Sequence, residues 1–148
     1  MVILGAIDEN ERAKTVIDLG YDLAETYDDQ FVPFHVIPEA EYQAHREAIR
    51  HISGFTEFTI SQEVESAKEF ARKLTLASID SPDGSRIDPR GSVGDPAEEI
   101  IAIANNLDPR FLVICGKRRS PVGKVLFGSV AQQVLVNVSC PVVTKIEG

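Results

Sequence analysis

The sequence of 148 residues has no tryptophan, one methionine and two cysteines. Cys115 and Cys140 have no histidine or third cysteine nearby, so they make a poor metal site and are interpreted as small buried apolar residues. No stretch approaches eighteen uninterrupted apolar residues, so we expect no membrane-spanning helix and no membrane partner. The N-terminal segment shows neither a basic region nor a cleavage site, which predicts a cytoplasmic protein.

Positive charge is also scarce. The chain carries 15 Lys and Arg against 23 Asp and Glu, a net charge of -8, which argues against a nucleic-acid partner. The distribution is uneven, because six basic residues and one acidic residue fall after position 108. A local positive field of this kind suits a compact anion.

Short apolar runs alternate along the chain with stretches of helical periodicity. Such runs are typical of strands buried on both faces, whereas apolar residues three and four positions apart indicate amphipathic helices. The expected strands are 2–7, 31–37, 86–93, 111–115 and 141–146. The expected helices are 9–27, one with a buried stripe over 64–74, 96–105 and 128–138, with a shorter piece near 41–51.

This alternation predicts an α/β fold, in which an open parallel sheet carries helices on both faces. We see no repeat and no second unit, so 1–148 is expected to be a single domain. Pro33 is unfavourable inside a strand, while Asp88 and Pro89 indicate that 86–93 lies at a sheet edge. The segment 116–127 is expected to be a basic, glycine-bearing loop.

Two segments of the chain point to a binding site. Ligands of open parallel sheets bind outside the carboxyl ends of the strands. Asp8 follows the first strand there, and the loop after the fourth strand leads into a helix that begins near Gly128 and Ser129. A helix N-terminus offers free N–H groups and a positive dipole end, and glycine lets a phosphate approach closely.

Basic side chains in the same loop strengthen this interpretation. Arg118 and Arg119 are flanked by Lys117 and Lys124, and arginine can bind an oxyanion through two parallel hydrogen bonds. We therefore predict a phosphate-bearing ligand at this end of the sheet. The alternative is a solvated basic loop followed by an ordinary helix cap.

Other chemistry finds little support. Neither a G-x-x-x-x-G-K-[ST] motif nor a G-x-G-x-x-G motif occurs. Asp8 either accepts a hydrogen bond from a ligand or caps the first helix. His35 is expected to be a hydrogen-bonded core residue, and His45 and His51 lack the spacing of a helical metal pair. No acid and base pair is placed by the sequence, so we assign no catalytic residue and no metal ligand.

An ordered set of short motifs covers the whole chain. It comprises Ile7-Asp8, His35-Val36-Ile37, Val93-Gly94-Asp95-Pro96, Leu112 to Gly116, Phe127-Gly128-Ser129-Val130 and Cys140 to Val143. In these motifs the sequence resembles the universal stress protein family. The resemblance implies an adenine nucleotide alpha hydrolase-like fold, with five strands in the order 3-2-1-4-5. It also implies a homodimer paired through the last strand.

The same resemblance implies a site for ATP. If Mg²⁺ binds as well, we expect it to arrive with the phosphates and to keep several waters. The resemblance places Asp8 and the main chain of Val36 near adenine, Gly116 by the ribose and phosphates, and Gly128, Ser129 and Val130 at the phosphates. The family's nucleotide-binding loop has the form G-x-x-G, nine residues, then G-[ST]. Here Arg119 replaces the second glycine, and eight residues separate it from Gly128.

Three functional hypotheses follow. The first is a stress-response protein that binds ATP or another adenine nucleotide and regulates a protein partner whose identity is unknown. The second is an interaction protein of the same fold that keeps only the anion site, as the departure at Arg119 would favour. The third is a slow ATPase.

Overall fold

The computed structural model describes residues 1–50, 59–118 and 125–147. Its strands are β1 (Val2–Ile7), β2 (Gln30–Pro38), β3 (Arg90–Gly94), β4 (Phe111–Arg118), β5 (Val125–Leu126) and β6 (Val142–Glu147). Its helices are α1 (Arg12–Tyr27), α2 (Glu39–Arg50), α3 (Ile60–Ser78), the 3-10 turn η1 (Gly84–Arg86), α4 (Pro96–Leu107) and α5 (Ser129–Asn137). No helix in these ranges is long and apolar enough to cross a bilayer.

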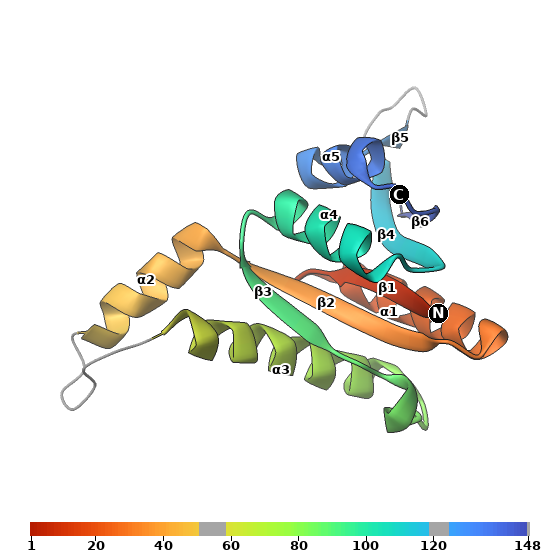
Figure 1. The fold of residues 1–148 in the computed structure, drawn as a ribbon, viewed down its shortest axis with the longest axis horizontal. Helices are drawn as coiled ribbons and strands as arrows, with labels where there is room; N and C mark the ends of the chain where they lie inside the picture. The colour runs from red at the N-terminus through yellow and green to blue at the C-terminus, as the bar shows by residue number, and fades with distance from the viewer. Residues whose placement is uncertain (51–58, 119–124, 148) are drawn as a thin grey trace.

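The sheet confirms the predicted topology. β1 lies between β2 and β4, β3 pairs with the outer side of β2, and β6 pairs with β4. These five strands are parallel and follow the predicted order 3-2-1-4-5, counted over the parallel strands (Figure 1). β3 is a terminal strand of the sheet, as predicted, but it begins at Arg90, so the expected start at position 86 was wrong and Asp88 and Pro89 precede the strand.

The region expected to be a loop between β4 and α5 contains additional strand structure. β4 continues to Arg118, and Val125 and Leu126 pair antiparallel with its last two residues. The expectation of a simple loop over 116–127 was therefore wrong at both ends of that segment. A two-residue strand is too short to leave a periodic signal in the sequence.

Pro33 lies inside β2 without costing the sheet a hydrogen bond. Phe31 forms a bridge with Ile87, and regular pairing with β3 resumes at Phe34 and Arg90. Pro33 falls in this interruption. Proline has no backbone N–H to donate, and at this position the neighbouring strand offers no acceptor that would need one. The residue is fully buried, and β2 is a central strand despite the proline.

Two hydrophobic cores lie on opposite faces of the sheet. One core packs Ala97, Ile100 and Ala104 of α4 and Val134 of α5 against the strands. The other packs α1 and α3 against the opposite face. Because consecutive strand residues point to opposite faces, β1 contributes Leu4 to the first core and Ile3 to the second.

The helical predictions were mostly confirmed. α2 occupies the predicted short piece, and α3 is longer than its apolar stripe indicated. Thr59 begins α3 with a capping box, in which its side chain accepts from the Gln62 N–H and the Gln62 side chain accepts from the Thr59 N–H. α1 begins at Arg12 instead of the expected position 9. Cys140 is buried as expected, whereas Cys115 is half-buried, and within the described residues neither forms a disulfide.

Candidate functional site

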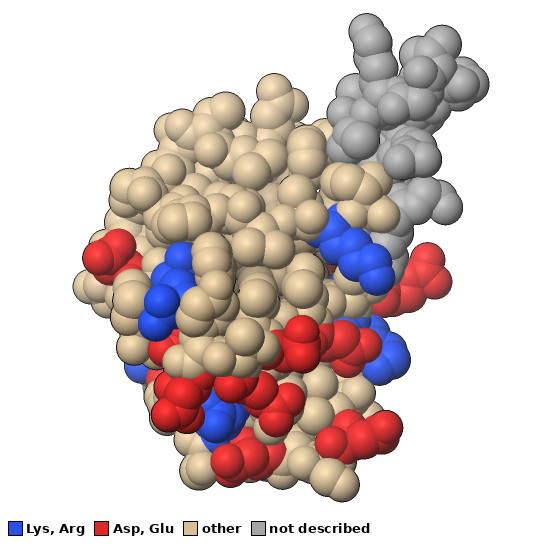
Figure 2. Space-filling view, turned by 90° about the vertical axis from the view of Figure 1, so that its right-hand side faces the viewer, with Lys and Arg blue, Asp and Glu red and all other residues tan. Residues whose placement is uncertain are grey.

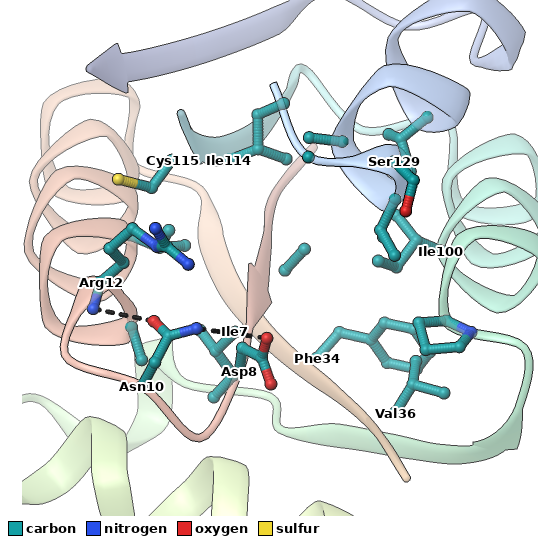
Figure 3. A pocket seen from close by; sticks show the side chains of 18 of the residues that line it. Ile7, Asp8, Asn10, Arg12, Phe34, Val36, Ile100, Ile114, Cys115 and Ser129 are labelled. Atoms are coloured by element: carbon teal, nitrogen blue, oxygen red, sulfur yellow. Dashed lines mark hydrogen bonds between the residues drawn. The ribbon is translucent and has the colours of Figure 1, made fainter. Parts of the chain in front are cut away.

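A pocket of about 430 Å³ opens at the carboxyl edge of the sheet (Figure 3). Its wall includes the carboxyl ends of β1, β2 and β4, together with the first residues of α1, α4 and α5. It draws side chains from both hydrophobic cores, since Val16 belongs to one and Val134 to the other. The pocket thus lies where the sequence predicted a ligand, and its volume is within the range of small-molecule sites.

The turn between β1 and α1 forms one side of the pocket. Asp8 is exposed at its rim, where Oδ1 accepts from the Glu9 N–H at 2.8 Å and Oδ2 accepts from Asn10 Nδ2 at 3.3 Å. Asn10 Oδ1 in turn accepts from the Arg12 N–H at 2.9 Å. Asn10, and not Asp8, therefore makes the side-chain hydrogen bond to the first residue of α1. Asp8 keeps lone pairs that face the pocket.

Apolar side chains of β2 and α4 form the floor of the pocket. Phe34, Val36 and Pro38 alternate along β2 and so present their side chains to the same face, opposite Ile100 of α4. Phe34 and Val36 are 3% and 8% exposed. An apolar surface of this kind suits an aromatic ring system.

The N-terminus of α5 forms the opposite side of the pocket. Gly128 is the N-cap residue, and it provides no side-chain hydrogen bond to the first N–H groups of the helix. Its φ of -63° is open to any residue, and a Cβ atom added there would meet no atom within 4 Å. Neither backbone conformation nor internal packing therefore requires a glycine at this position. The bare backbone leaves room for a ligand beside exposed Ser129 and Val130.

The structure brings five of the eight predicted site residues to this pocket. They are Asp8, Val36, Gly128, Ser129 and Val130. Gly116 is buried at the end of β4, where an added Cβ would come within 2.7 Å of the Phe127 and Ile146 side chains. Packing thus already accounts for this glycine, and its predicted contact with ribose and phosphates stays a prediction. Arg118 ends β4, and Arg119 lies outside the described residues.

Sequence reasoning missed most of the other residues that line the pocket. Those that bring a polar, sulfur-bearing or aromatic side chain to it include Asn10, Arg12, Phe34 and Cys115. Arg12 lies four positions before buried Val16, so it falls on the inner stripe of α1, a signal that could have identified it. Phe34 shares the alternation of Val36, which also pointed to the pocket face.

The histidines have structural contacts outside this pocket. His35 is 3% exposed, its Nδ1 lies 3.1 Å from the Ile7 carbonyl oxygen, and its ring lies 4.4 Å from that of Phe70. It is the core histidine that the sequence predicted. His45, which we assigned no role, lies 3.0 Å from Oε1 of buried Glu63 and so links α2 to α3. His51 lies outside the described residues.

Across the described ranges, no group of three or more His, Cys, Asp or Glu residues is arranged to hold a metal ion. Of the described residues that line the pocket, Asp8 is the one that carries a carboxylate. A divalent cation entering here would keep most of its waters or arrive bound to phosphate oxygens.

A protein-family model matches nearly the whole chain. Residues 1–144 match the model of the Universal stress protein family. A universal stress protein from Mycolicibacterium smegmatis is 44% identical over 48 residues, which make up 32% of this chain and 37% of that protein.

Solved structures agree on the fold. The universal stress protein of Archaeoglobus fulgidus has a TM-score of 0.67 at 22% identity, covering 97% of each chain. The same organism's protein in complex with dAMP has a TM-score of 0.59 at 17% identity, covering 97% of this chain and 96% of that one. An Arabidopsis thaliana universal stress protein family protein with AMP bound has a TM-score of 0.56 at 13% identity, and the match covers 100% of this chain and 93% of that one.

These similarities confirm the predicted adenine nucleotide alpha hydrolase-like fold. The strand order and the motif set agree with the same conclusion. Since the family model extends from residue 1 to residue 144, this chain belongs to the universal stress protein family.

Proposed function

We propose that this protein binds an adenine nucleotide in the pocket at the carboxyl edge of its sheet and acts as a nucleotide-dependent regulatory module of the stress response. The observation that carries the proposal is the division of the pocket into three parts. Asp8 forms a polar rim on one side, Phe34 and Val36 form an apolar floor, and the bare N-terminus of α5 faces them.

Each part of the pocket suits one part of a nucleotide. The apolar floor accepts the base, and the Asp8 carboxylate accepts a hydrogen bond from a ribose hydroxyl or an amino group. The free N–H groups and the dipole of α5 stabilise a phosphate beside the Ser129 hydroxyl. Related proteins support this division, because solved structures of family members contain dAMP and AMP.

Isothermal titration calorimetry with adenosine, AMP and ATP tests the proposal. We expect AMP and ATP to bind with one site per chain and adenosine to bind more weakly. Replacing exposed Ser129 with alanine removes one hydroxyl donor to the phosphate, so Ser129→Ala is expected to weaken AMP about fivefold to tenfold.

A serine away from the pocket gives the matched control. Ser66 is exposed on α3, and Ser66→Ala is expected to leave the AMP affinity unchanged. The proposal fails when neither AMP nor ATP binds at millimolar concentration, or when both alanine variants weaken AMP equally.

The homodimer is also a proposal, supported by the edge of the sheet. β6 pairs with β4 on one side, and no described strand pairs with its other side. Proteins commonly cover such an edge. Val136 of neighbouring α5 is 73% exposed. The described residues at the height of α5 are almost all uncharged on the face seen in Figure 2.

The register of β6 identifies the residue to change. The Pro141 carbonyl accepts from the Leu112 N–H and so faces β4, and alternate residues such as Thr144 turn their N–H to the open edge. Thr144→Pro removes that outward donor and is expected to convert a dimer of twice 16.2 kDa to monomers in light scattering. Thr144→Ala should stay dimeric. A wild-type protein of monomer mass at micromolar concentration would refute the proposal.

A further inference from the structure

Arg12 presents a cation to the pocket for which the described residues provide no partner. The residue is half-buried, and Figure 3 shows its side chain extending into the pocket from α1. Within the described ranges no carboxylate oxygen lies within 4.0 Å of its guanidinium, and no acceptor is hydrogen-bonded to it. Its five N–H donors are therefore available to a ligand.

The fold itself gives no reason for a cation at this position. Arg12 is the first residue of α1, where the positive end of the helix dipole disfavours a positive side chain. Two residues on, Lys14 shows the ordinary alternative, since its ammonium lies 3.1 Å from Asp18 on the outer surface. Arg12 thus carries a local electrostatic cost that an anionic ligand would offset.

The position of Arg12 separates it from the phosphate site at α5. Figure 3 shows Arg12 and Ser129 on opposite sides of the pocket, with Asp8 at its lower edge in this view. Under the proposed function, Asp8 faces the nucleoside and Ser129 faces the 5′-phosphate. Arg12 therefore faces the ribose side of the ligand, away from the 5′-phosphate.

We propose that Arg12 binds a second phosphate, esterified to the 2′- or 3′-oxygen of the ribose, so that the preferred ligand is an adenosine bisphosphate. This inference rests on the proposed function of the same pocket. The chemistry has a general precedent, because in dinucleotide sites an acidic residue binds a free ribose hydroxyl and a nearby arginine accommodates a 2′-phosphate. Guanidinium also matches phosphate geometry through two parallel hydrogen bonds.

Calorimetry with five probes tests the inference: AMP, ADP, ATP, adenosine 2′,5′-bisphosphate and adenosine 3′,5′-bisphosphate. ADP has the same number of phosphates as the bisphosphates but carries both on the 5′-oxygen. We expect one bisphosphate to bind about tenfold more tightly than AMP and ADP, in keeping with a charge-assisted hydrogen-bonded pair. Arg12→Gln should abolish that preference, so that neither bisphosphate binds more tightly than ADP.

Lys14→Gln is the matched control, because it removes the same charge from the same helix outside the pocket. It should retain the full preference for the bisphosphate. Thermal unfolding of Arg12→Gln should match or exceed wild type, since the substitution removes a cation from the positive end of a helix.

Two results would overturn the inference. In the first, AMP binds and neither bisphosphate binds more tightly than ADP. In the second, Arg12→Gln weakens ADP and ATP by the same factor as the bisphosphate, which would place Arg12 on the 5′-phosphate chain. Absence of any AMP binding would instead contradict the proposed function, and this inference with it.

Discussion

Gly128→Asp is expected to weaken AMP binding about 100-fold while leaving the protein at least as stable as wild type. The substitution places a carboxylate at the N-cap of α5, where we propose that the 5′-phosphate lies. The new side chain repels the phosphate and also accepts hydrogen bonds from the N–H groups that the phosphate would use.

Stability and affinity should move in opposite directions in this variant. Aspartate is a favourable N-cap residue, and a negative charge suits the positive end of a helix, so α5 gains about 0.5 kcal/mol relative to glycine. The backbone at Gly128 has φ -63° and ψ 165°, and an added Cβ meets no atom within 4 Å, so aspartate fits without strain. A loss of binding cannot then be attributed to unfolding.

Gly128→Asn provides the control for size and capping. Asparagine has nearly the same shape and also caps helices, but it carries no charge. We expect it to weaken AMP less than aspartate does, with calorimetry and thermal unfolding measured on the same samples. Equal AMP affinity in wild type and Gly128→Asp would show that the phosphate lies elsewhere.

The position of Gly128 at the pocket shows which parts of this region the sequence could place. A Gly-Ser pair at the start of a helix, after a strand and a basic segment, indicates an anion-binding helix N-terminus from residues that are close together in the sequence. Strands such as β1 and β4 could also be predicted. A short, nearly continuous apolar run such as Val2 to Ile7 is typical of a parallel strand that is buried on both faces.

Arg12 shows why the rest could not be predicted. By itself it is one more cation on an acidic protein, and its neighbours Glu9 and Glu11 indicate a solvated helix start. Its place in the pocket depends on how α1 is packed beside β4 and across from α5, which follows from the sheet order and not from local sequence. The place of Pro33 inside a central strand could not be predicted for the same reason. The interruption in strand pairing that accommodates it involves a segment more than fifty residues later in the chain.

The second large effect concerns stability and lies at the amino end of the sheet. Asp29 is 5% exposed, and its carboxylate accepts from Arg110 Nε at 2.7 Å and Nη2 at 3.4 Å. The hydrogen bond from Arg110 lowers the pKa of Asp29 below its ordinary value of 3.8, although burial opposes the shift. The Arg110 guanidinium also lies 4.5 Å from the centre of the Tyr27 ring.

Arg110→Met should destabilise the protein at neutral pH. Methionine retains an apolar stem against Tyr27 but leaves the buried Asp29 carboxylate with the Met1 amino group, at 3.4 Å, as its remaining charged neighbour. Leaving a buried carboxylate without its main partner costs about 2–3 kcal/mol, so the urea midpoint should fall clearly. Arg90→Met removes a more exposed arginine paired with Asp88 and should cause little change.

The pH dependence identifies Asp29 as the cause. A carboxyl group with a lowered folded-state pKa contributes stability that is present above its unfolded value and is lost as the pH falls through its folded value. The gap between wild type and Arg110→Met in urea unfolding should therefore be full at pH 7 and shrink progressively below about pH 4. A gap that stayed constant down to pH 3 would mean that lost packing on Tyr27, and not the unpaired carboxylate, destabilises the variant.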